Sequence, residues 1–252
     1  MGSLKHRVIP VVLTDGINVV KGEKFTNDRT VGNYEAVARL YGSRDVDELL
    51  LLDVTARSRG TTISAEVISY FANQLNIPLS VGGGIDSLSD ASTCFRNGVE
   101  KIVLSTSAFL NPSLIYDIAN IFGSQALILS LDFKNFESKK IMVNSGQREI
   151  NVELEEIIER FEKLGAGEFL LQSCANDGTM MGMDFEKIKL VRSITNLPII
   201  ASSGAGSLDD FLLAIECGAS AVAAGAIFQF TEITPKIVTE FLSSRNIEMR
   251  RN

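Results

Sequence analysis

Eight short apolar segments alternate along the whole chain with eight longer segments of amphipathic, helix-like pattern. The apolar segments are 8–13, 48–53, 79–81, 101–104, 126–132, 168–173, 199–202 and 221–224; the helix-like segments are 34–41, 63–75, 88–97, 112–122, 152–164, 185–194, 208–217 and 235–243. Most of the apolar segments do not alternate with polar residues, which is typical of parallel strands buried on both faces. Eight strand–helix units in 252 residues predict an α/β fold, a single (β/α)₈ TIM barrel domain over 1–252. A doubly wound open sheet fits eight regular units less well, and the polar stretch 135–149 is expected to be a loop inserted after the fifth strand.

An internal repeat with an offset of 120 residues supports the barrel. The segment PLSVGGG at 78–84 reappears as PIIASSG at 198–204. Further matches at the same offset are Ser87 with Ser207, Asp90 with Asp210 and Gly98 with Gly218. Because 120 residues correspond to four strand–helix units, we expect two similar half-barrels, roughly 5–122 and 123–245, each with a related site.

Composition excludes several classes of function. The formal net charge of −7 argues against a nucleic-acid-binding surface. No apolar run approaches the roughly 18 residues that a membrane span needs. Three widely separated cysteines, an odd number, indicate a reducing compartment, so we expect a cytoplasmic protein. His6 is the only histidine, which argues against a Ser-His-Asp triad and a multi-histidine metal site.

Small residues follow four of the strands in repeat-related pairs. Glycine backbone can approach an anion closely, and small residues at the start of a helix add N–H donors. The positions after the third and seventh strands are Gly83, Gly84, Ser203 and Gly204, and those after the fourth and eighth strands are Ser105, Thr106, Gly225 and Ala226. Tight turns alone would also explain the glycines, but their repetition favours two phosphate sites, which suit a ligand with a phosphate at each end.

Two acidic residues end apolar strands at the predicted mouth of the barrel. Asp132 closes the segment LILSLD and is a candidate general acid or base. Asp53 closes a similar segment but is expected to be a structural or orienting acid. The sequence Asp177-Gly178 in the sixth loop is also a strong turn signal.

Charged residues begin four strands at the opposite end of the barrel. They are Arg7, Glu48, Lys101 and Glu168. From the residues alone, a ring of alternating charge at this end indicates salt bridges that stabilise the fold.

The motifs of this chain resemble those of the cyclase subunit of imidazole glycerol phosphate synthase. The resemblance runs from Arg7 to near Arg250 and is dense in DELLLLD at 47–53, VGGGI at 81–85, NPSLI at 111–115, FGSQA at 122–126, GAGE at 165–168, DGT at 177–179 and LPIIAS at 197–202. It implies a (β/α)₈ barrel without a cofactor. It also implies a glutaminase subunit docked at the amino-terminal face, whose ammonia crosses the barrel to a bis-phosphorylated substrate.

The resemblance also implies roles for individual residues. Arg7, Glu48, Lys101 and Glu168 match the family's ammonia gate, which changes the interpretation of the charged ring from stability to passage. Lys21 matches a lysine in a mobile first loop, and Asp132 matches one of two catalytic aspartates. Phosphate-site positions match at Gly84, Thr106, Asp177, Gly178 and Gly204.

Three positions at the predicted reaction centre depart from the family pattern. Leu13 stands where the family has its first catalytic aspartate, Ser105 replaces an asparagine and Gln172 replaces a threonine. A leucine cannot transfer a proton. The opening RVIPVVL resembles a branch found beside bacterial surface-polysaccharide genes, whose barrels pass ammonia to a sugar amidotransferase.

Three functions therefore remain open. The first is an ammonia-channelling synthase subunit diverted to amidation of a polysaccharide sugar. The second is a histidine-pathway cyclase with an unusual arrangement of acids that recruits Asp15. The third is a non-catalytic barrel that binds and activates a glutaminase.

Overall fold

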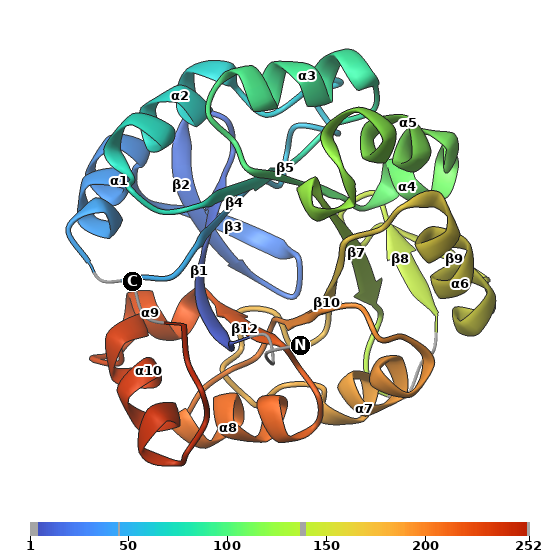
Figure 1. The fold of residues 1–252 in the computed structure, drawn as a ribbon. Helices are drawn as coiled ribbons and strands as arrows, with labels where there is room; N and C mark the ends of the chain where they lie inside the picture. Colours follow the sequence, from blue (N-terminus) through green and yellow to red (C-terminus); the bar gives the residue numbers. More distant parts are fainter. Residues whose placement is uncertain (1–4, 45, 137–139, 251–252) are drawn as a thin grey trace.

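The computed structural model describes residues 5–44, 46–136 and 140–250. Within these ranges, eight parallel strands close into a barrel, as the sequence predicts (Figure 1). In order around the barrel they are β1 (Arg7–Thr14), β4 (Leu49–Asp53), β5 (Leu79–Gly82), β6 (Lys101–Leu104), β7 (Leu127–Phe133), β10 (Glu168–Ser173), β11 (Ile199–Ala201) and β12 (Ala221–Ala224). Pairing of β12 with β1 and of β7 with β10 leaves no open edge.

Helices surround the barrel and cover the outer face of its strands (Figure 1). They are α1 (Tyr34–Gly42), α2 (Ala65–Gln74), α3 (Leu88–Arg96), α4 (Thr106–Leu110), α5 (Ser113–Phe122), α6 (Leu154–Leu164), α7 (Phe185–Ile194), α8 (Leu208–Glu216), α9 (Ala226–Phe230) and α10 (Pro235–Ser244), with a short 3₁₀ turn at Ser124–Ala126. Side-chain caps start the repeat-related helices α3 and α8, where Ser87 and Ser207 each accept a hydrogen bond from a backbone N–H in the first turn. None of the described helices could cross a membrane.

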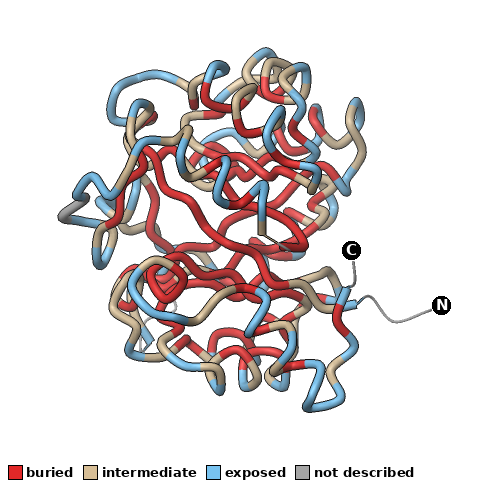
Figure 2. The backbone as a smooth tube through the Cα atoms, turned by 90° about the vertical axis from the view of Figure 1, so that its left-hand side faces the viewer, coloured by how far each residue is buried: buried red, intermediate tan, exposed pale blue. Residues whose placement is uncertain are grey.

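Strand residues divide into two apolar layers because successive side chains point to opposite faces. The cluster inside the barrel contains Ile9, Val11, Leu13, Val20, Leu50, Val103, Ile128, Leu170, Ile200, Ala221 and Ala223. The intervening strand residues pack against the helices in a larger second cluster. The strands are therefore buried on both faces, and exposed segments lie at the periphery (Figure 2).

Two β-hairpins at the carboxyl ends of the strands are absent from the sequence prediction. Strands β2 (Asn18–Glu23) and β3 (Thr26–Asn33) form a hairpin after β1, and β8 (Ile141–Val143) and β9 (Arg148–Ile150) form a second after β7. The second hairpin corrects the expected loop at 135–149, apart from residues 137–139, which lie outside the described part. Both hairpins extend the barrel sheet by antiparallel pairing, β2 with β1 and β8 with β7.

The secondary-structure elements repeat with the same offset of 120 residues. Elements at corresponding positions in the two repeats are β5 and β11, α3 and α8, β6 and β12, and α4 and α9. We interpret the barrel as two similar halves on this basis.

Candidate active site

A large pocket opens at the carboxyl ends of the barrel strands, on the side of both hairpins. It encloses about 1280 Å³ of empty space up to its mouth. The predicted site residues that line it are Leu13, Lys21, Asp53, Gly83, Gly84, Ser105, Thr106, Asp132, Asp177, Gly178, Ser203, Gly204, Gly225 and Ala226. Sequence analysis therefore identified residues that the fold brings to one cavity. In the part of the chain that the structure describes, no group of histidine, cysteine or acidic side chains could hold a metal ion.

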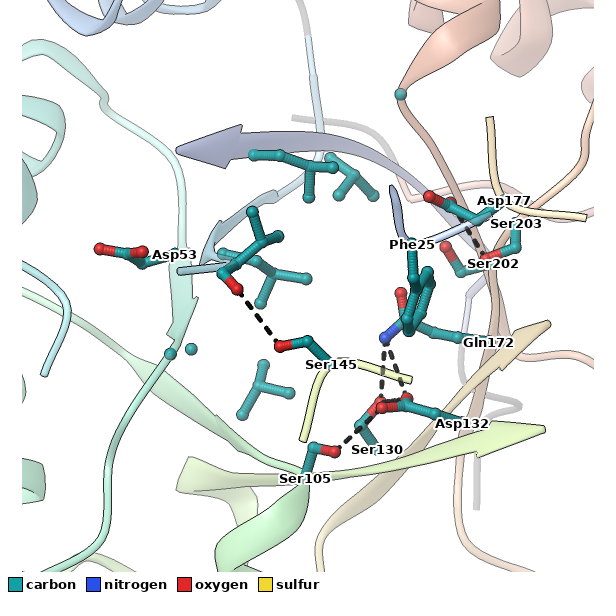
Figure 3. Close-up of a pocket in the computed structure, with 18 of the residues that line it drawn as sticks. Phe25, Asp53, Ser105, Ser130, Asp132, Ser145, Gln172, Asp177, Ser202 and Ser203 are labelled. Carbon is teal, nitrogen blue, oxygen red and sulfur yellow. Dashed lines mark hydrogen bonds between the residues drawn. The ribbon is translucent and has the colours of Figure 1, made fainter. Parts of the chain in front are cut away.

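Asp132 lies at the end of β7 with its carboxylate held by three side chains (Figure 3). Ser130 Oγ donates to Asp132 Oδ1 at 2.6 Å, and Gln172 Nε2 donates to the same oxygen at 3.1 Å. Ser105 Oγ donates to Oδ2 at 2.9 Å. Asp132 is only 4% exposed, and this burial raises the pKa of its carboxyl despite the three donors. A buried carboxyl of raised pKa is suited to exchange a proton with a bound ligand.

Leu13 occupies the opposite wall of the pocket. Strands β1 and β7 are four positions apart in either direction around the eight-stranded barrel. The Leu13 side chain belongs to the inner apolar cluster and lines the pocket. The pocket therefore presents a carboxyl group on one side of its centre and an aliphatic group on the other.

Asp15 caps a turn and lies outside the pocket. Its Oδ1 accepts hydrogen bonds from the backbone N–H groups of Ile17 at 2.9 Å and Asn18 at 2.7 Å, which cap the turn between β1 and β2. Slight burial would raise the pKa of the Asp15 carboxyl, but these hydrogen bonds lower it. Asp15 is not among the residues that line the pocket.

Asp53 holds the loop between β4 and α2. Its Oδ1 accepts from the backbone N–H of Ala56 at 2.8 Å, and its Oδ2 pairs with Arg59 Nη2 at 2.8 Å. The carboxylate lies on the far side of the pocket from Asp132 (Figure 3). Both carboxylate oxygens of Asp53 bond groups of its own loop, which is the arrangement expected of a structural or orienting acid.

The two glycine turns pack closely against the backbone of neighbouring loops, as the tight-turn interpretation requires. Gly84 has a φ of +64°, and a Cβ there would lie 2.0 Å from the carbonyl oxygen of Thr61. Gly204, its partner in the repeat, has a φ of +90°, and a Cβ there would lie 2.1 Å from the carbonyl oxygen of Gly182. Only glycine fits either position. Ser203 adopts a φ of +74°, a left-handed conformation that is unusual for serine.

The short helices α4 and α9 begin beside these turns. Thr106 is the first residue of α4, and Ala226 is the first residue of α9 after Gly225. Ser105 precedes α4 but bonds Asp132, so its side chain serves the acid rather than the anion site.

Lys21 lies on strand β2 of the hairpin that follows β1, where the sequence analysis expects a loop. It is 5% exposed, and its Nζ would lie 3.0 Å from a Cβ built on Gly225. A cation therefore stands beside the amino end of α9. The hairpin is fixed partly by the tight packing of Gly178, where a Cβ would lie 2.2 Å from the carbonyl oxygen of Gly22.

Asp177 and Gly178 form the loop that supports this side of the pocket. The backbone carbonyl of Asp177 accepts from Lys24 N at 2.8 Å, and its Oδ1 accepts from Ser203 Oγ at 3.2 Å. The Asp-Gly turn thus joins the β2–β3 hairpin to the turn after β11.

A ring of four charges closes the amino-terminal end of the barrel. Arg7 bonds Glu48 at 2.7 Å and Glu168 at 2.6 Å, and Lys101 bonds Glu168 at 2.5 Å and Glu48 at 3.3 Å. Ser80 Oγ also donates to Glu48 at 2.8 Å. Burial alone would raise the pKa of Glu168, but the charges of Arg7 and Lys101 lower it. The structure therefore brings all four predicted gate residues into one ion-pair network.

Several pocket residues were missed by sequence analysis. Ser130 donates to Asp132, and its inward position follows from counting two residues back from Asp132 along β7. Phe25, Arg57 and Ser145 reach the pocket from turns and loops, and no periodicity in the sequence indicates them.

Comparisons with known proteins agree with this architecture. A family model described as "Histidine biosynthesis protein" matches residues 7–234. The chain is 39% identical over 249 residues to imidazole glycerol phosphate synthase subunit HisF of Dictyoglomus thermophilum, covering 98% of this chain and 99% of that protein. It is 40% identical over 255 residues to the protein of the same name from Thermobifida fusca, covering 98% and 100%, and 37% identical over 257 residues to that from Mycobacterium tuberculosis, covering 99% and 96%. This chain therefore belongs to the HisF family of imidazole glycerol phosphate synthase subunits.

Proposed function

We propose that this chain is the ammonia-using synthase subunit of a glutamine amidotransferase. A glutaminase docks at the amino-terminal face, and a phosphorylated substrate binds in the pocket. The observation that carries the proposal is the arrangement along one barrel axis: a ring of four charges at one end, an apolar interior, and a pocket with a buried acid between two glycine turns at the other.

The interior of the barrel favours passage of neutral ammonia over ammonium. Between the charged ring and the pocket lie inward side chains that carry no charge, among them Ile9, Leu50, Val103, Ile128 and Leu170. Moving an unpaired cation through such a layer costs far more than moving a neutral molecule of the same size. The charged ring would have to part for a molecule to enter, because its ion pairs close the lower end.

The pocket offers acid–base catalysis from one side only. Asp132 can transfer a proton, and Leu13 on the opposite wall cannot. Cyclisation in the histidine pathway, as the resemblance implies it, uses a carboxyl group on each side of the reacting centre, and each such group contributes roughly 10²–10⁴ in rate. The asymmetric pocket therefore supports a diverted reaction, in which ammonia is used to amidate a surface-polysaccharide sugar with a separate sugar amidotransferase.

The second candidate is the histidine-pathway cyclase. Identities of 37–40% to proteins named imidazole glycerol phosphate synthase subunit HisF favour it. In that case Asp132 would have to serve as both acid and base, because Asp15 caps a turn.

An assay with the histidine-pathway intermediate and saturating ammonium separates the two candidates, because it needs no glutaminase. We expect negligible cyclase turnover. Turnover near that of an ordinary cyclase would establish the second candidate and reject the diverted reaction. In parallel, a titration with the candidate glutaminase should show a complex and faster glutamine hydrolysis; absence of a complex would reject both candidates.

A further inference from the structure

Arg57 places a guanidinium group at the pocket that the proposed function does not yet use. It lies in the loop between β4 and α2 and lines the pocket with a side chain that is 28% exposed. Among the described pocket-lining residues, Arg57 and Lys21 are the cations.

The hydrogen bonds of Arg57 orient its guanidinium but leave one side of it available. Arg57 Nε donates to Asn144 Oδ1 at 3.0 Å. Its Nη1 donates to both carboxylate oxygens of Asp86, at 2.7 and 3.0 Å. Within the described part of the chain, Nη2 has no hydrogen-bond partner. The two N–H groups of Nη2 are therefore free to bind an acceptor.

The same contacts place Arg57 between the two elements of the first glycine-turn site. Asp86 lies two residues after Gly84 in the sequence. Asn144 donates its backbone N–H to Thr106 Oγ1 at 2.8 Å, at the start of α4. A Cβ on Gly84 would lie 3.2 Å from the Cβ of Ala56, the residue before Arg57. Arg57 is thus tied to both the turn after β5 and the helix after β6.

Each of the two repeat-related sites consequently has one cation beside it. Lys21 stands at Gly225 in the second site, and Arg57 is held beside the first site by Asp86 and Asn144. Lys21 lies on β2 and Arg57 lies in the loop between β4 and α2, so the two cations are not at repeat-related positions. The pairing of one cation with each site is therefore a property of the folded pocket.

We propose that Arg57 binds a phosphate group of the substrate at the site formed by Gly83, Gly84 and Thr106, through its unpaired Nη2. This inference rests on the proposed function, which places a phosphate there. The guanidinium brings a positive charge and the two N–H donors of Nη2 to a phosphate, whereas backbone amides alone supply no net charge. Asp86 and Asn144 keep the group oriented before the ligand arrives, which reduces the entropy lost on binding.

Binding of inorganic phosphate, followed by ³¹P NMR, tests the role of Arg57. The titration is made on the full chain and on a Lys21→Gln background, which weakens the second site and leaves the first to be measured. We expect Arg57→Gln to weaken phosphate binding at the first site about tenfold or more, as the loss of a charge-assisted contact predicts. Arg57→Lys, which keeps the charge without the paired donors, should bind with intermediate affinity.

Two controls separate ligand binding from other roles of Arg57. Arg96→Gln removes the same charge at the last turn of α3 and should bind phosphate like the unmodified chain. Asn144→Gly removes the tie between Arg57 and the β8–β9 turn but keeps the backbone N–H, and glycine suits its φ of +53°. Because Arg57 keeps its charge and its bonds to Asp86, this variant should lose less affinity than Arg57→Gln.

The outcomes are distinct. If the unmodified chain binds phosphate and Arg57→Gln binds it equally well, Arg57 does not bind the ligand. If neither the unmodified chain nor the Lys21→Gln background binds phosphate, the phosphate site of the proposed function fails and this inference with it. Thermal unfolding of each variant shows whether a loss of binding comes from loss of the fold.

Discussion

Replacement of Lys101 by methionine tests the charged ring most directly. Methionine keeps most of the apolar stem and removes the ammonium group, which bonds Glu168 at 2.5 Å and Glu48 at 3.3 Å. The two carboxylates then share the single guanidinium of Arg7. Their side chains are only 9% and 1% exposed, so water cannot replace the lost cation fully.

The structure sets the expected loss of stability. Removal of one partner from a buried ion pair costs about 3–5 kcal/mol when the remaining charge is left unpaired. Here Glu168 keeps Arg7 Nη2, and Glu48 keeps Arg7 Nη1 and the Ser80 hydroxyl. Because each carboxylate keeps a partner, we expect the free energy of unfolding to fall by about 2–3 kcal/mol, below that range.

Urea unfolding measured at several pH values checks the size of this loss of stability and the direction of its pH dependence. The pKa of folded Glu168 is lowered by Arg7 and Lys101, so its contribution is present above the unfolded pKa and is lost as pH falls through the folded pKa. The deficit of Lys101→Met should therefore be largest at neutral pH and shrink in acid. Lys163→Met is the matched control, because its side chain is 77% exposed and its pair with Glu159 contributes at most about 1 kcal/mol.

Ammonia transfer supplies the functional half of this test. With the candidate glutaminase bound, Lys101→Met should alter the ratio of glutamine hydrolysed to product formed, while added ammonium restores product formation. A variant that unfolds more easily but keeps the normal ratio would show that the ring is structural and would refute the gate.

Three further substitutions test the pocket. Asp132→Asn should lower turnover in the proposed reaction at least about 100-fold. Because burial raises the pKa of Asp132 in the folded chain, the contribution of Asp132 to stability is lost as pH rises through that pKa. Urea unfolding at neutral pH should therefore show that the variant is more stable than the unmodified chain. Leu13→Asp should recover some cyclase activity on the histidine-pathway intermediate, limited by Ser105 and Gln172, and an inactive but folded variant would show that the missing acid is not the main difference. Gly84→Ala should lower the free energy of unfolding by more than about 1 kcal/mol, because its φ is +64°, and should abolish phosphate binding at the first site; an unchanged phosphate titration would reject that site.

Sequence patterns predicted the barrel because every barrel strand is buried on both faces and every large helix has one apolar face. Predicted boundaries such as 101–104 and 168–173 agree with β6 and β10 to the residue. The hairpins were missed because one strand of each lacks this pattern: β9 has the sequence REI with an exposed arginine, and β3 begins TNDR. Such segments become strands only through pairing, β3 with β2 and β9 with β8, which is a property of the assembled sheet.

Every second residue of a barrel strand faces inward, and this rule predicts further site residues from the sequence. The gate residue Arg7 faces inward, and six residues later Leu13 does so too. The same count from Glu168 leads to Gln172, which bonds Asp132. The same count from Glu48 does not include Asp53, whose carboxylate bonds Arg59 instead. Parity along the strand thus separates the two acids that end apolar strands.

The departures from the family pattern lie on the same strands as the charged ring. Leu13, Ser105 and Gln172 point inward at the carboxyl ends of β1, β6 and β10, whose amino ends carry Arg7, Lys101 and Glu168. Buried ion pairs are weak stabilisers, since apolar residues of similar volume often serve as well or better. A need for stability alone therefore does not explain a complete charged ring beneath an altered pocket. We propose that a requirement to admit ammonia explains it, because such a gate would serve any acceptor chemistry at the other end of the barrel.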